Sequence, residues 1–324
     1  MTGMTKLTGG RALNFTLDFA FPLLLVVLAI GFALASPGFL SVDNIMGTLH
    51  AMAPITVIAA GMALVVMMGK LDISVGSIAF VSMSMAAIAM TEQSWPFWLA
   101  ACLAIAMGAL MGSINGFAVV VLRVNPLIAT LGSMVAFRGL ALQLTNSQVI
   151  VLPDHVRALG NLSIGPLFVD IFVAFVILLA LHLVHRHTPF GRNVTAIGND
   201  EKTAARIGIP VRSTVFLAFV VTGILAAIGG IITASQVGSV TTFLGRGMEF
   251  TAVAVVVVGG ISLFGGRGSI LWGVLLGALT FELIRSGLNH VGANPYFYEL
   301  IGGAIIFVAM YGVALKSREK GGVY

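Results

Sequence analysis

The chain has 324 residues, of which 58% are hydrophobic and only 9% are charged, and its mean hydropathy of +1.06 excludes a water-soluble globular protein. Its net charge of +5 does not indicate nucleic-acid binding, because the basic residues are scattered between apolar stretches without interleaved aromatic residues. The single cysteine, Cys102, excludes a disulfide framework and a cysteine-based metal site, and we assign no metal.

About ten apolar stretches have the length of a membrane-spanning helix, which needs about 20 residues. In chain order the predicted spans are 18–36, 49–68, 73–91, 97–122, 126–146, 166–185, 213–234, 249–265, 269–289 and 297–315. Two of them, 73–91 and 249–265, are short, interrupted by glycine and bordered by charges. The predicted fold class is therefore an all-α polytopic membrane protein in which some helices are short or broken.

The basic residues predict the orientation of these spans. With the N-terminus in the cytoplasm, all Lys and Arg residues lie on the cytoplasmic side except Arg138, Arg157, Arg246 and Arg285. Cytoplasmic loops carry the excess of Lys and Arg in membrane proteins. We therefore expect both termini in the cytoplasm and a single transmembrane domain over residues 1–324.

A polar break follows the second predicted span, in the stretch GKLDISVGS. Asp72 lies there at the end of an apolar run, just before Ser74, Gly76 and Ser77. Ionised groups at membrane depth are costly and suggest function, so these residues are candidates for the solute pathway. The alternative is structural, because Asp72 or Ser74 could cap the next helix.

Residues 186–212 form the longest predicted cytoplasmic connection and contain a cluster of charges. Asn199 or Asp200 is predicted to cap a short helix through EKTAAR, which Gly208 and Pro210 end. We expect the small residues Ala204 and Ala205 on its surface, where they would allow close docking of a cytoplasmic partner. The alternative is a solvated linker.

Four motifs, in order along the chain, resemble one known family. They are GKLDISVGS, NPLIATLGSMVAFRGLALQLTN, FGRNVTAIGNDEKTAARIGI and GGISLFGGRGSI. They are similar to segments of the permease subunits of bacterial ATP-binding cassette importers for monosaccharides, such as the ribose, xylose and arabinose permeases. Locally the chain departs from the family pattern, with Lys70 in place of a glycine and Ile261 in place of a threonine.

The resemblance implies the fold of these permeases, a location in the bacterial inner membrane and a role in the import of a monosaccharide or related polyol. It implies three partners: a second permease copy or homologue, a periplasmic sugar-binding protein, and a cytoplasmic ATPase that often has two fused nucleotide-binding domains. The segment 186–212 would be the coupling segment that binds the ATPase. Its candidate contact residues are Gly191, Arg192, Gly198, Asn199, Asp200, Glu201, Lys202, Ala204, Ala205, Arg206, Gly208 and Ile209.

The chain itself is not expected to be an enzyme. It lacks the G-x-x-x-x-G-K-[ST] loop that cradles nucleotide phosphates. We therefore expect ATP and Mg to be bound by the partner ATPase, and no cofactor by this chain.

A path for a neutral polyol needs hydroxyl and amide groups with little net charge. The further candidates for the pathway or its gate are Asn115, Asn125, Thr130, Glu249, Ser262 and Phe264. For each polar residue a hydrogen bond between helices remains the alternative. Glu249 is expected to face the periplasm with Arg246, either as a carboxylate at a helix N-terminus or as a contact for the binding protein.

The main alternative function is an ion-coupled secondary transporter of a small polar solute, which is also built from broken helices. Such a transporter needs carboxylates near the middle of the membrane, whereas the acidic residues here fall mostly at the ends of predicted spans. An intramembrane hydrolase is disfavoured because all six histidines lie at or near such ends.

Overall fold

A computed structural model describes residues 25–294, 297, 300–301, 303–304 and 307. Most of the predicted span 297–315 and the first part of the span 18–36 lie outside these residues. The membrane helices are Leu25–Ala35, α2 (Val42–Met67), α3 (Val75–Thr91), α4 (Phe97–Val120), α5 (Pro126–Leu144), α7 (Val169–His187), α10 (Val211–Val237), α11 (Met248–Val258) and α12 (Ile270–His290).

The predicted all-α polytopic fold is confirmed. Within the described residues, six helices are long and apolar enough to cross a membrane, namely α2, α4, α5, α7, α10 and α12. Both stretches that looked interrupted, 73–91 and 249–265, form shorter apolar helices, α3 and α11. Helix α11 ends at Gly259 because the following residues, through Ser269, form a glycine-rich loop.

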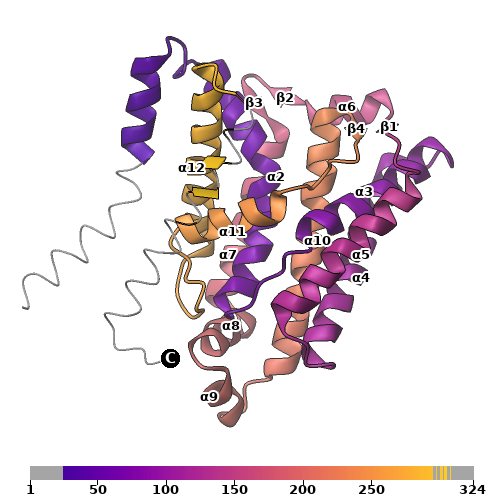
Figure 1. Cartoon of the computed structure of the whole chain (residues 1–324), viewed down its shortest axis with the longest axis vertical. Helices are drawn as coiled ribbons and strands as arrows, with labels where there is room; N and C mark the ends of the chain where they lie inside the picture. The colour runs from indigo at the N-terminus through magenta and orange to yellow at the C-terminus, as the bar shows by residue number, and fades with distance from the viewer. Residues whose placement is uncertain (1–24, 295–296, 298–299, 302, 305–306, 308–324) are drawn as a thin grey trace, which may run out of the picture.

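The core of the molecule is built around α2, which packs against α10, α12, α11 and α7 (Figure 1). Helix α10 contacts α2 and also packs against α4. There a Cβ atom on Gly108 would lie 2.4 Å from the carbonyl oxygen of Gly223, so only glycine permits this backbone contact. The glycines that recur every four residues in α4 therefore lie on the face of this helix that packs against α10.

A small extramembrane layer covers the end of the molecule opposite α8 and α9 (Figure 1). It contains α6 (Asp154–Gly160) and two antiparallel strand pairs, β1 (Ile150–Val151) with β4 (Ser239–Val240) and β2 (Ser163–Ile164) with β3 (Leu167–Phe168). The predicted orientation assigns this end to the periplasm. The sequence reading missed this layer, because two-residue strands have no periodicity to detect.

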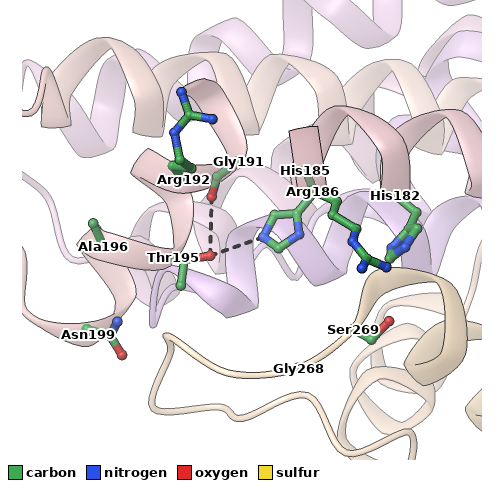
Figure 2. A pocket seen from close by; sticks show the side chains of 10 residues that line it. All are labelled: His182, His185, Arg186, Gly191, Arg192, Thr195, Ala196, Asn199, Gly268 and Ser269. Carbon is green, nitrogen blue, oxygen red and sulfur yellow. Dashed lines mark hydrogen bonds between the residues drawn. The ribbon is translucent and has the colours of Figure 1, made fainter. Parts of the chain in front are cut away.

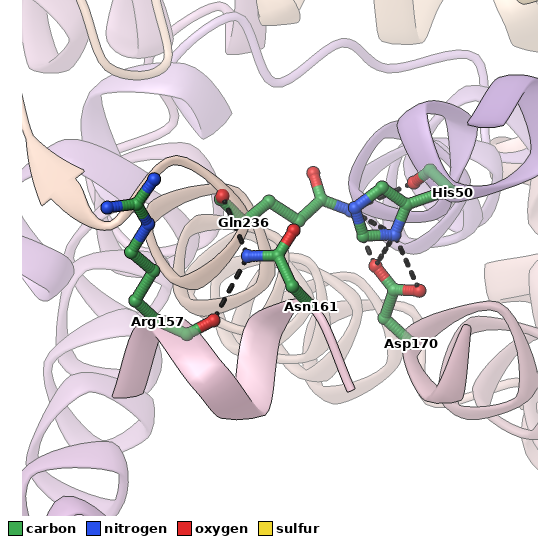
Figure 3. Close-up of polar contacts among 5 residues, drawn as sticks. All are labelled: His50, Arg157, Asn161, Asp170 and Gln236. Atoms are coloured by element: carbon green, nitrogen blue, oxygen red, sulfur yellow. Dashed lines mark hydrogen bonds and ion pairs between the residues drawn. The ribbon is translucent and has the colours of Figure 1, made fainter. Parts of the chain in front are cut away.

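A partly buried polar cluster joins three membrane helices at this same end (Figure 3). His50 Nδ1 of α2 lies 2.8 Å from Asp170 Oδ2 of α7, and the Gln236 amide of α10 donates to the His50 carbonyl oxygen at 2.8 Å. The same amide donates to Asp170 Oδ2 at 2.5 Å. Asn161, which follows α6, donates to the Gln236 carbonyl oxygen at 3.2 Å. The cluster therefore fixes the relative positions of these helix ends.

Candidate functional site

The charged connection between α7 and α10 folds into two helices, α8 (Pro189–Asn199) and α9 (Glu201–Arg206). They lie together at the lower end of the molecule in Figure 1. Only α9 was expected from the sequence. Helix α8 is amphipathic, burying Gly191, Val194 and Ile197 while Arg192 is exposed.

Asp200 is the N-terminal cap of α9, which confirms one of the two predicted alternatives, Asn199 and Asp200. Its carboxylate accepts hydrogen bonds from the backbone N–H of Thr203 at 3.1 Å and of Lys202 at 2.9 Å. These bonds, with that from the Thr203 hydroxyl, hold the pKa of Asp200 below its usual range. At the other end Gly208 adopts a left-handed backbone with φ +84°, which ends the helix as predicted.

The expectation that Ala204 lies on the docking surface is wrong. Ala204 is only 2% exposed and packs into the core. One face of α9 lies against the rest of the protein, and Ala204 is on that face. The exposed face instead carries Lys202, Ala205 and Arg206. The next residue, Ile207, has a large apolar side chain that is 71% exposed. It was not among the contact residues predicted from the sequence.

The C-terminal end of α8 meets the membrane helices in a tight backbone junction. The N–H of Gly266, in the loop between α11 and α12, donates to the Met67 carbonyl oxygen at the end of α2 at 2.8 Å. A Cβ atom on Gly198 would lie 1.8 Å from that oxygen and 2.4 Å from the Gly266 nitrogen. Two of the four motifs, those that contain Gly198 and Gly266, thus meet at the end of α2, although 131 residues separate Met67 from Gly198.

A second contact joins α9 to the break between α2 and α3. Lys70 Nζ lies 2.8 Å from Glu201 Oε2, and the side chains are 12% and 51% exposed. The lysine that departs from the family pattern therefore has a partner in the connection between α7 and α10.

Three of the predicted pathway residues form one buried hydrogen-bonded cluster beside this break, and a fourth, Thr130, is buried next to it. Asp72 Oδ1 accepts from the Ser74 N–H at 3.0 Å and from its hydroxyl at 2.6 Å. Asn115 Nδ2 of α4 donates to Ser74 Oγ at 2.7 Å, and the Thr130 hydroxyl of α5 donates to the Pro126 carbonyl oxygen at 2.9 Å and lies 3.5 Å from that of Leu71. All four are 0% exposed, so none faces a solute in this conformation.

Glu249 does not lie at the periplasmic surface as expected. It is 6% exposed, and its Oε1 accepts from the Gly247 N–H at 3.3 Å. The loop before α11 folds inward against the first turn of α3, where a Cβ on Gly76 would lie 2.1 Å from the Gly245 carbonyl oxygen and 2.4 Å from Glu249 Oε2. Arg138 of α5 supports this loop by donating to the Leu244 carbonyl oxygen at 3.3 Å.

The remaining candidates are not gathered with the Asp72 cluster. Asn125 is exposed and caps α5, where its side chain accepts from the Leu127 N–H at 3.0 Å. Ser262 accepts from the Phe264 N–H at 3.2 Å within the loop that follows α11. The Phe264 side chain is 60% exposed, and Ser77 is buried in α3.

Residues 44–310 match a family described as branched-chain amino acid transport system, permease component. The probable ABC transporter permease protein YphD of Escherichia coli is 39% identical over 303 residues, 92% of this chain and 90% of that protein. The ribose import permease protein RbsC of Bacillus subtilis is 35% identical over 91% of each chain. The autoinducer 2 import system permease protein LsrC of Photorhabdus luminescens is 33% identical over 78% of this chain and 76% of that protein. No solved structure matches the chain.

Proposed function

This chain belongs to the permease family of ATP-binding cassette sugar importers, and from this premise we propose that it carries a monosaccharide or related polyol from the periplasm to the cytoplasm. It is a multi-pass protein of the inner membrane. In the proposal a separate ATPase binds ATP and Mg, a periplasmic sugar-binding protein delivers the solute, and a second permease copy or homologue completes the pathway.

The observation that carries the proposal is the junction at Gly198. The end of α8 packs directly against backbone atoms of α2 and of the loop before α12. Because protein interiors are close-packed, a movement of α8 has to displace these two segments as well. Nucleotide binding by the ATPase would move α8 and α9 and so shift the packing of α2. The break that contains Asp72 and Ser74 follows α2 directly and would be rearranged with it, together with the hydrogen bond from Asn115 of α4 to Ser74.

The test replaces the exposed face of α9. In the double variant Ala205→Glu and Arg206→Glu, the docking surface gains bulk and its charge is reversed, while the buried Ala204 is unchanged. We expect association with the ATPase to weaken at least tenfold, which is about 1.4 kcal/mol. Co-purification of the full complex from membranes and sugar uptake by whole cells are the two measurements.

Ala158→Glu is the matched control, because Ala158 is an exposed alanine of α6 at the opposite end of the molecule. It should leave ATPase co-purification unchanged. Normal ATPase association of the double variant would contradict the assigned coupling surface. Sugar uptake by membranes that contain the chain but no ATPase would instead support the ion-coupled transporter.

A further inference from the structure

A cavity of about 530 Å³ opens between the C-terminal end of α7, helix α8 and the loop that leads into α12 (Figure 2). Arg186, Arg192, His182 and His185 line it, and its lining contains no carboxylate. In the part of the chain that the structure describes, neither arginine has a carboxylate partner. The cavity therefore collects positive charge that these residues do not neutralise.

The start of α12 adds a second attractive element for an anion. Gly268 and Ser269 line the cavity, and Ser269 is the N-cap of this 21-residue helix. The N-terminus of a helix carries partial positive charge and free N–H groups, which suit a phosphate group. Figure 2 shows the Arg186 side chain beside His182, on the side of the cavity where Ser269 lies.

The polar atoms of the two histidines differ in their partners. The Thr195 hydroxyl donates to the Gly191 carbonyl oxygen at 3.2 Å, so it accepts from His185 Nε2, also at 3.2 Å. This bond holds the His185 ring in place. His182 Nδ1 is buried and has no hydrogen-bond partner among the described residues, although buried polar atoms are normally satisfied.

The surroundings of the cavity favour a lipid as the source of that phosphate. On the turn of α7 before Arg186, Leu183 and Val184 are 46% and 40% exposed, and Trp272, on the first turn of α12, is 60% exposed. Helices α7 and α12 pack against each other. Apolar side chains there can contact acyl chains, and exposed tryptophan is typical of the interface of a bilayer.

We infer that this cavity binds the phosphate headgroup of an anionic phospholipid of the inner leaflet. The headgroup contacts Arg186 and the first turn of α12, Arg192 adds positive charge at the edge of the cavity, and the acyl chains lie along the exposed faces of α7 and α12. Basic pockets between membrane helices at the cytoplasmic side are suited to such headgroups. The site lies between α8 and the start of α12, so a bound lipid stabilises the packing of α8 against the loop before α12.

The experiment measures retained lipid on the full-length chain by native mass spectrometry after exchange into defined detergent. The chain is titrated with phosphatidylglycerol, with phosphatidylcholine and with inorganic phosphate. We expect preferential retention of phosphatidylglycerol and about fivefold weaker binding in Arg186→Gln, since each basic residue near an anionic surface contributes on this order. Arg123→Gln is the matched control, because Arg123 is an exposed basic residue of the loop between α4 and α5, away from the cavity.

A second variant keeps the test valid if Arg186→Gln does not fold. Ser269→Asp retains a good N-cap for α12 and adds a negative charge at the cavity, so it should weaken phosphatidylglycerol binding too. Equal retention by Arg186→Gln and Arg123→Gln would overturn the inference. Binding of inorganic phosphate without any preference for phosphatidylglycerol would overturn the lipid assignment. Loss of the lipid when the ATPase assembles would show a protein-docking surface instead.

Discussion

Gly198 is the single residue on which the close backbone junction between α8, α2 and the loop before α12 depends. A side chain there would meet the Met67 carbonyl oxygen and the Gly266 nitrogen, both of which are backbone atoms that cannot rotate away. The sequence AIGND indicates a turn or helix end but says nothing of this contact. The requirement for glycine is therefore steric and tertiary.

We predict that Gly198→Ala separates coupling from membrane insertion. Forcing a methyl group into such a contact costs about 1–3 kcal/mol, which the protein relieves by moving α8 away from α2. ATPase-driven uptake should fall at least tenfold, with the melting temperature lowered in a detergent thermal-shift assay.

The control for this prediction is Gly132→Ala. Gly132 also lies within a helix, α5, but a Cβ there has nothing within 4 Å, so stability and uptake should be retained. Similar losses in the two variants would mean that the effect is not specific to the junction.

At the scale of elements, the ends of α2, α7 and α10 are held together by the cluster of His50, Asp170 and Gln236 (Figure 3). The ring of His50 also stacks on Phe168 with a centroid distance of 4.1 Å. The other ends of α2 and α7 lie next to the coupling helices. A rigid anchor at one end leaves movement to be absorbed at the other.

Replacing Gln236 with leucine should test this anchor. The Gln236→Leu variant removes the amide that donates to Asp170 and to the His50 carbonyl oxygen, leaving two partly buried acceptors short of a donor. We expect a loss of about 1–3 kcal/mol in stability, measured as a lower melting temperature of the purified chain. Gln148→Leu makes the same substitution at an exposed position and should change little. An unchanged melting temperature in Gln236→Leu would contradict the claim that this cluster holds the helix ends together.

Besides its apolar packing against the membrane helices, the proposed coupling segment makes two contacts next to the turn that follows α2. One is the Gly198 junction, and the other is the pair of Lys70 and Glu201. The Gly198 junction lies before this turn, at the end of α2, and the ion pair lies after it, just before the buried Asp72. Exposed ion pairs contribute little stability, so the pair serves better as a positional contact than as a clamp.

Cross-linking this second contact should stop transport. In a Cys102→Ser background, Lys70→Cys with Glu201→Cys provides two thiols that a short reducible linker can join. We expect uptake to be lost on cross-linking and recovered on reduction, with ATPase association intact throughout, because only relative movement is blocked. Each single-cysteine variant, treated in the same way, is the control. Full uptake by the cross-linked protein would show that the coupling segment does not move against the core.

Hydropathy, charge and capping are local properties of the chain, so the sequence alone predicted the membrane class and the apolar helices within the described residues, and it suggested where a coupling segment would lie. It also predicted the cap at Asp200 and the stop at Gly208. Tertiary structure alone decided that Ala204 faces inward, that Glu249 is buried against α3, and that the Asp72 cluster is closed to solute. These features depend on contacts between segments far apart along the chain, and such contacts leave no periodic trace in the sequence.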